Sequence, residues 1–69
     1  MQQYIDFKNN FSSIPHKSVE DLKINNIEVD GEFVYRVCWK CCGSFHSFST
    51  EQMYYANRVY DLLESKLKV

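Results

Sequence analysis

The sequence predicts an α+β fold in which a three-stranded antiparallel β meander carries an N-terminal and a C-terminal helix on one face, in the order α-β-β-β-α. Three observations predict this fold. Apolar residues recur at helical spacing near both ends of the chain, the residues between them alternate in polarity, and two glycine-containing turns interrupt the alternation. A chain of 69 residues has room for one domain, residues 1–69.

The N-terminal segment has the pattern of a short amphipathic helix, with apolar residues at spacings of three and four and polar residues between them. The apolar positions are Tyr4, Phe7, Phe11 and Ile14. We expect this helix to end before Pro15, because the residue before a proline is disfavoured in the α region. One further helical turn is predicted at residues 18–21, where Ser18 stands three residues before Asp21 as in a capping box.

A period near two leads from residue 22 into the turn Asp30-Gly31, where the glycine accepts a positive φ. A two-residue loop would place Ile27 opposite Val34. A three-residue loop with a bulge at the glycine would place Ile27 opposite Phe33. Both registers pair apolar residues, so the sequence leaves both open.

The clearest alternation in the chain covers the second predicted strand. The residues predicted to face the core are Phe33, Tyr35, Val37, Trp39 and Cys41, and those predicted to face outward are Val34, Arg36, Cys38, Lys40 and Cys42. A three-residue loop, 41–43, follows, with glycine in the position where a type I turn plus bulge needs a left-handed residue. In that register Trp39 lies opposite Phe45, and Cys38 lies opposite His46.

Three signals agree on the start of the last helix. Ser49 can cap it, Gln52 can reach back from the third position, and Phe48 can pack on Met53 as a hydrophobic staple. An apolar stripe at helical spacing follows, and its members are Met53, Ala56, Val59, Tyr60, Leu63 and Leu67. Basic residues near the end of this stripe suit the negative end of the helix dipole.

The order α-β-β-β-α in a chain of this length resembles the double-stranded RNA-binding domain, in which two helices pack on one face of a three-stranded meander. The resemblance is one of topology and covers nearly the whole chain. It implies binding of A-form RNA through the first helix, the loop between the first two strands and a lysine cluster at the start of the last helix. Here residues 50–56 carry an acid and two tyrosines instead of lysines, and the short Asp30-Gly31 loop is flanked by Glu28 and Glu32.

A second resemblance covers residues 31–63, where three strands and a helix are similar to AP2-type and integrase N-terminal DNA-binding domains. It implies that the sheet face reads DNA, here with Arg36, Lys40 and His46. The eight Lys and Arg residues of the chain are dispersed among nine acids. We therefore expect weak affinity for nucleic acid, since each neutralised phosphate needs a cation.

Two surfaces are candidates for binding a partner. The first is the outward sheet face, made of Val34, Arg36, Cys38, Lys40 and His46. The second is an acidic edge, made of Glu20, Asp21, Glu28, Asp30 and Glu32, within a segment whose one cation is Lys23. Charge on an edge strand discourages pairing with another sheet, and the same acids could attract a basic, nucleic-acid-binding protein.

The cysteines suggest a metal site or a nucleophile, and both hypotheses can be weighed. Cys38, Cys41, Cys42 and His46 lie around one hairpin loop and are candidate zinc ligands. A regular strand places Cys38 and Cys41 on opposite faces, so we expect no bound metal or other cofactor. Cys38 and His46 could meet as a cross-strand pair, but no orienting acid or amide accompanies them, and we expect no enzyme.

The favoured hypothesis is a small non-enzymatic adaptor or inhibitor that docks on a partner protein. In size and acidity the chain is similar to phage or mobile-element products that block host nucleic-acid-processing defence proteins. The alternatives are a nucleic-acid-binding module of the double-stranded RNA-binding or AP2 type, and a zinc-stapled structural domain that a chelator would unfold. An exposed edge on the first or third strand would also permit a homodimer by strand addition. An odd number of cysteines, no long apolar run and no secretion signal predict a cytoplasmic protein without a membrane span.

Overall fold

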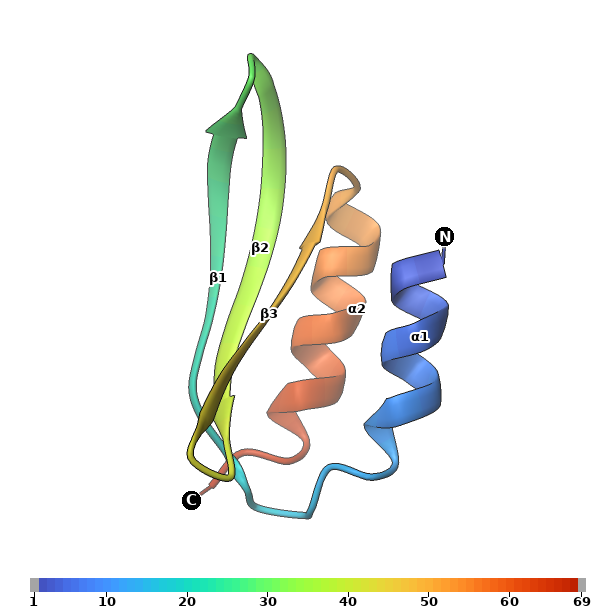
Figure 1. Cartoon of the computed structure of the whole chain (residues 1–69), viewed down its shortest axis with the longest axis vertical. Helices are drawn as coiled ribbons and strands as arrows, with labels where there is room; N and C mark the ends of the chain where they lie inside the picture. The colour runs from blue at the N-terminus through green and yellow to red at the C-terminus, as the bar shows by residue number, and fades with distance from the viewer. Residues whose placement is uncertain (1, 69) are drawn as a thin grey trace.

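The computed structural model describes residues 2–68 and confirms the α+β fold in the predicted order (Figure 1). The elements are α1 (Gln2–Phe11), β1 (Val19–Val29), β2 (Glu32–Cys41), β3 (Ser44–Thr50) and α2 (Met53–Glu64). The strands form one antiparallel sheet in the order β1-β2-β3. Helix α2 packs across the three strands on one face, and α1 lies beside α2. Within residues 2–68 no helix has the length and apolar content needed to cross a membrane.

Helix α1 ends before Pro15, as its sequence predicts. The amides of Ser13 and Ile14 bond back to the carbonyls of Asn10 and Phe11 at 3.2 and 3.0 Å and close the last turn. The single helical turn predicted at residues 18–21 is wrong, because β1 already begins at Val19. The Ser18 hydroxyl donates to the Pro15 carbonyl at 2.6 Å and so supports the connecting turn rather than a helix cap.

The β1–β2 hairpin turns on two residues in left-handed conformation, Asp30 with φ 52° and Gly31 with φ 82°. Ile27 therefore lies opposite Val34, which is one of the two registers that the sequence allows. The hairpin extends beyond the ends of both helices (Figure 1). This extension explains why Phe33 is 62% exposed although its side chain points to the helix side of the sheet, where Val37 is fully buried.

A bulge interrupts β1 near its base. Glu20 pairs with Lys40 and Lys23 pairs with Cys38, so two residues of β1, Asp21 and Leu22, stand opposite one residue of β2. Asp21 adopts a left-handed φ of 53° at this point. The extra residue lets Leu22 pack against the core.

The predicted register of the β2–β3 hairpin is wrong by one residue. The loop has two residues, Cys42 with φ 55° and Gly43 with φ 83°, and Cys41 pairs with Ser44. Such a turn with two left-handed residues follows the twist of the flanking strands, and Cys42 accepts the strained conformation that the prediction reserved for glycine. The shift moves every side chain of β3 to the face opposite the predicted one.

Helix α2 begins later than its capping signals predict. Ser49 and Thr50 remain in β3, where they pair with β2, so Ser49 is not the helix cap. Gln52 occupies the N-cap position without a side-chain cap, and its amide donates to the Thr50 hydroxyl at 3.2 Å. The predicted hydrophobic staple does not bury Met53 against Phe48, since Met53 is 55% exposed. Strand pairing outcompetes the local capping preference here.

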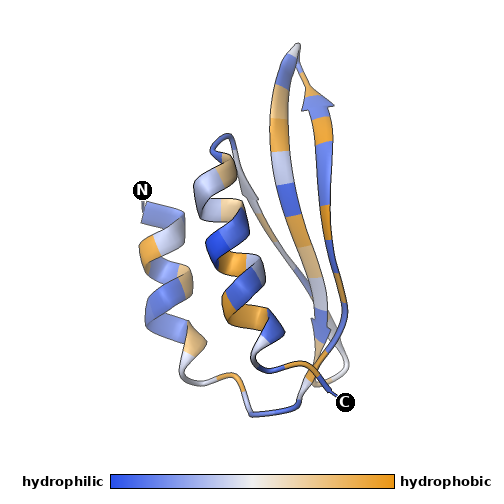
Figure 2. Cartoon of the chain, turned by 180° about the vertical axis from the view of Figure 1, so that it is seen from behind, coloured by the Kyte–Doolittle hydropathy of each residue, from blue (hydrophilic) through white to orange (hydrophobic). Residues whose placement is uncertain are grey.

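The core lies between α2 and the sheet. Its buried members are Val19, Val37, Trp39, Cys41, Phe48, Ala56, Val59 and Leu63. Figure 2 shows hydrophobic and hydrophilic residues interspersed along the two long strands. The segment after α2 returns to the base of β1, where the Val19 amide donates to the Lys66 carbonyl at 2.9 Å and the Lys68 amide donates to the Val19 carbonyl at 2.7 Å.

Candidate protein-interaction surfaces

The face of the sheet opposite the helices has no second layer over it within residues 2–68 (Figures 1 and 2). We call it the open face. Cross-strand partners share a face, so the pairings assign its members: Glu20, Lys23, Asn25, Ile27 and Val29 from β1, Glu32, Val34, Arg36, Cys38 and Lys40 from β2, and Phe45, Ser47 and Ser49 from β3. This surface combines apolar side chains with both signs of charge.

Phe45 is the most prominent apolar side chain of the open face, at 76% exposed. The Lys40 ammonium lies 5.5 Å from the centre of its ring and forms a cation–π contact. On the same face the Arg36 guanidinium donates to the Ser49 hydroxyl at 3.3 Å. These contacts hold two cations close to the sheet, beside the half-buried Cys38.

Four of the five residues predicted for the outward sheet face lie on the open face, and His46 does not. His46 pairs with Trp39 on the helix side, where the two rings stack at 5.7 Å between centroids and 22° between planes. Phe45 takes the place predicted for His46. The sequence could not reveal this exchange, because a one-residue change in turn length reverses the faces of β3.

The five acids predicted to form one acidic edge lie in two places. Glu20 and Asp21 are at the base of β1, where the Glu20 carboxylate pairs with the Lys68 ammonium at 3.1 Å. Glu28, Asp30 and Glu32 are at the tip of the β1–β2 hairpin. Glu28 lies eight positions after Glu20 along the strand, a span of roughly 26 Å. Of the predicted acidic edge, only Glu28, Asp30 and Glu32 form a concentrated group of negative charges, and we call these three residues the acidic tip.

The candidate zinc ligands do not converge. Cys38 lies on the open face and His46 on the helix side, so the predicted Cys38–His46 pair is also wrong. The buried Cys41 thiol lies 3.4 Å from the Cys42 sulfur and 3.5 Å from the Ser18 hydroxyl. The hydrogen bond with Cys41 raises the pKa of the Cys42 thiol, which lowers the fraction of this side chain present as the nucleophilic thiolate at neutral pH. Among residues 2–68 no group of three or more His, Cys, Asp or Glu side chains is placed to hold a metal ion.

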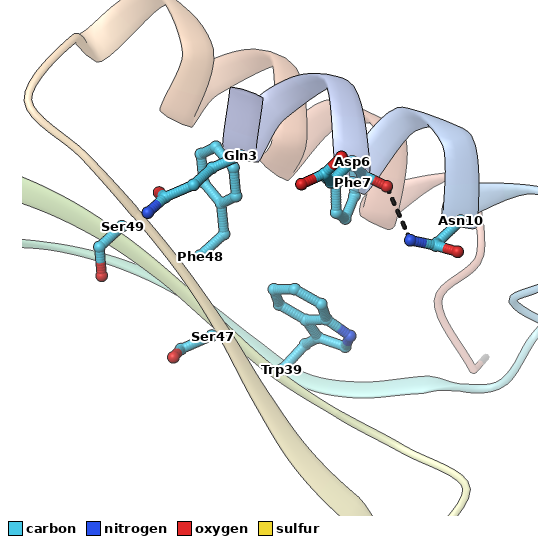
Figure 3. Close-up of a pocket in the computed structure, with 8 residues that line it drawn as sticks. All are labelled: Gln3, Asp6, Phe7, Asn10, Trp39, Ser47, Phe48 and Ser49. Carbon is cyan, nitrogen blue, oxygen red and sulfur yellow. Dashed lines mark hydrogen bonds between the residues drawn. The ribbon is translucent and has the colours of Figure 1, made fainter. Parts of the chain in front are cut away.

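An open groove of about 490 Å³ lies between α1 and the outer edge of β3. It is lined by Gln3, Asp6, Phe7, Asn10, Trp39, Ser47, Phe48 and Ser49. Figure 3 shows Trp39 pointing from the sheet toward α1, and the Asn10 amide donating to the Asp6 carbonyl at 2.9 Å along the helix. A smaller hollow of about 230 Å³ shares Phe7, Asn10 and Trp39 and reaches His46. The groove depends on where α1 docks, which periodicity along the chain does not reveal.

The start of α2 is aromatic rather than basic. Tyr55 packs between Tyr4 and Tyr54, with ring centroids 4.8 and 5.3 Å away. Arg58 is the first cation of the helix, and a hydrogen bond with the Tyr4 hydroxyl raises the pKa of its guanidinium. The position where the double-stranded RNA-binding domain has its lysine cluster is therefore occupied by tyrosines.

No family model, no curated protein and no solved structure matches this chain. The class that the fold defines is a small α+β domain with an α-β-β-β-α topology and one uncovered sheet face.

Proposed function

We propose that this chain is a small non-enzymatic protein-interaction module that docks on a partner protein through the open face of its sheet. The observation that carries the proposal is Phe45, an aromatic side chain on the edge strand β3 that is 76% exposed on an uncovered sheet face. Antiparallel sheets usually present polar residues to water on such a face. Here Ile27, Val29 and Val34 add further apolar area toward the hairpin tip. Aromatic residues and Arg are the types that protein interfaces favour.

The charges of the open face favour a protein partner over nucleic acid. Lys23, Arg36 and Lys40 share the face with Glu20 and Glu32. Binding of a phosphate backbone needs a cation for each neutralised phosphate, and the acids of the same face oppose it. The short hairpin loop and the tyrosines that open α2 supply no further cations.

The finer proposal concerns the kind of partner. The acidic tip holds Glu28, Asp30 and Glu32 on an arm that extends beyond the helices (Figure 1). Such a tip would attract a basic surface and raise the rate of association with it. We infer a nucleic-acid-processing protein as partner, which the module blocks in the manner of a phage or mobile-element inhibitor of a host defence protein.

Site-specific photo-crosslinking tests the docking face. A benzophenone amino acid at Arg36, on the central strand, is expected to give a discrete protein adduct in lysate of the source cells, and Phe45→Ser is expected to remove that adduct. The matched control is the same probe at Asn57, exposed on α2. Equal crosslinking from both positions, or none from Arg36, would show that the open face is not the docking surface.

Fluorescence anisotropy tests the alternative in the same purified protein. Labelled duplex RNA, duplex DNA and single-stranded RNA are titrated at low and at higher salt, and we expect no binding. Salt-sensitive binding that is lost in Arg36→Ala or Lys40→Ala would instead identify a nucleic-acid-binding module.

A further inference from the structure

The two edges of the sheet are protected to different degrees. The β1 edge carries charged residues, is bent by the bulge at Asp21, and is closed at its base by the hydrogen bonds between Val19 and the segment after α2. Bulges, charges and covering segments are the devices that keep an edge from pairing with another chain. Strand β3 has none of them: Ser44–Thr50 contains no Asp, Glu, Lys, Arg or Pro, and its pairing with β2 is continuous.

The outer edge of β3 presents a row of backbone groups. The two-residue turn makes Cys41 and Ser44 a hydrogen-bonded pair. Along an antiparallel ladder, hydrogen-bonded pairs alternate with pairs whose backbone groups point away from the partner strand. The N–H and C=O groups of Phe45, Ser47 and Ser49 therefore point away from β2. Within residues 2–68 no other backbone group bonds to these three residues.

The groove beside α1 runs along this same edge. Its lining includes Trp39 and Phe48, which point to the helix side, and also Ser47 and Ser49, which point to the open face (Figure 3). Only a groove at the edge of β3 can touch both faces of the strand. An added strand would lie about 4.8 Å from β3 and would turn alternate side chains toward the groove.

We propose that the outer edge of β3 binds an extended peptide segment of a partner protein by strand addition, with an apolar side chain over Phe7 and Trp39 and a basic side chain beside Asp6. Of the lining residues that the structure describes, Asp6 is the one with a charge. Its carboxylate accepts a hydrogen bond from the side-chain amide of Gln2 at 2.8 Å, and no Lys or Arg side chain among residues 2–68 forms an ion pair with it. Backbone hydrogen bonds would supply affinity in this binding mode, and the groove would supply specificity.

A second copy of this chain fits the edge less well than a peptide does. A copy that paired through its own β3 would turn His46 and Phe48 toward the groove. Phe48 is already buried in its own core, and His46 is stacked on its own Trp39. Strand β3 also has no lysine or arginine to place beside Asp6. An extended peptide segment can place an unburied apolar side chain in the groove and a lysine or arginine beside Asp6.

The test uses the purified full chain as bait for a phage-displayed library of short random peptides. Selected peptides are expected to alternate apolar residues and to carry at least one Lys or Arg. Ser47→Pro removes one outward N–H and blocks the edge, and it is compatible with folding because that N–H does not bond to β2. We expect Ser47→Pro to weaken the selected peptides by about tenfold or more, the equivalent of one lost hydrogen bond, and Ser47→Ala to leave their affinity unchanged.

Three results would overturn the proposal. They are a library without enrichment, selected peptides that bind Ser47→Pro as well as the native chain, and a native dimer in sedimentation that Ser47→Pro makes monomeric. If Ser47→Pro fails to fold, hydrogen exchange in the native chain decides instead, because a bound strand must slow the exchange of the Phe45, Ser47 and Ser49 amides. This proposal stands apart from docking at the open face, since the peptide test uses no cellular partner and the crosslinking probe at Arg36 does not lie on the edge.

Discussion

Lys66 ties the end of α1 to the end of α2, and its replacement is the sharpest test of this packing. Its ammonium donates to the Phe11 carbonyl at 3.0 Å and to the Ile14 carbonyl at 2.6 Å, and it lies 4.4 Å from the centre of the Phe11 ring. It therefore satisfies carbonyl groups at the C-terminal end of α1, where a cation also suits the helix dipole. Helix α1 has no fully buried residue, and its other contacts with the core come from the half-buried rings of Tyr4 and Phe7.

We expect Lys66→Met to lower the free energy of unfolding by about 2 kcal/mol. Each hydrogen bond from a charged donor contributes about 1.5–3 kcal/mol, and the cation–π contact adds roughly 0.5–1 kcal/mol. The half-buried position and the retained aliphatic stem of methionine reduce the sum. The matched control is Lys68→Met, which removes the ion pair with Glu20, whose side chains are 65% and 40% exposed. Such a surface pair contributes at most about 1 kcal/mol.

Urea denaturation followed by Trp39 fluorescence and far-UV circular dichroism measures both variants. A domain of this size is stable by roughly 3–10 kcal/mol, so both should fold. With a urea dependence of about 1 kcal/mol per molar, Lys66→Met should lower the midpoint by about 2 M, and Lys68→Met by no more than about 1 M. Equal shifts for the two variants would refute the assigned role of Lys66.

Three further predictions test the sheet and its second turn. Trp39→Ala should cost about 3–5 kcal/mol in a urea melt, and a loss below about 1 kcal/mol would contradict the assignment of the sheet faces. An alanine Cβ at Gly43 would meet no atom of residues 2–68 within 4 Å beyond its chain neighbours, so Gly43→Ala should lower the free energy of unfolding only by the cost of the left-handed conformation, about 1–2 kcal/mol. No loss of stability would contradict the left-handed conformation of Gly43. Cys41→Ala removes the hydrogen bond that raises the pKa of the Cys42 thiol. In a Cys38→Ser background, where the signal comes from Cys42, the pH at which alkylation of Cys42 becomes fast should therefore be lower in Cys41→Ala than in the chain that keeps Cys41. An unchanged pH profile would disprove that coupling.

The sequence predicts the order of elements and the faces of β2 because both follow from periodicity along one segment. The alternation that places Val37, Trp39 and Cys41 in the core is independent of what packs on them. The second turn is a different case. Two-residue and three-residue loops both place Gly43 in the left-handed region, and local preference favours the loop that spares Cys42 from it. Pairing along all seven residues of β3 decides between the loops, and pairing is a tertiary property.

The same reasoning explains which parts of the site the sequence could predict. Val34, Arg36, Cys38 and Lys40 lie on one strand, so their shared face follows from alternation alone. The position of His46 depends on the turn, and the groove depends on how α1 docks against β3. Contacts between segments far apart in the sequence lie outside the reach of a local pattern.

The Lys66 contacts also link the stability of the domain to the proposed peptide site. The segment after α2 accepts a hydrogen bond from Val19 at the base of β1 through the Lys66 carbonyl. Through the Lys66 ammonium it also holds the end of α1, the helix that forms one wall of the groove. Loosening α1 should therefore weaken a peptide at β3 while leaving docking at the open face unchanged. Under conditions where the variants are fully folded, we expect Lys66→Met to bind the selected peptides several-fold more weakly than Lys68→Met does. Equal peptide affinity in the two variants would show that the β3 edge binds without help from α1.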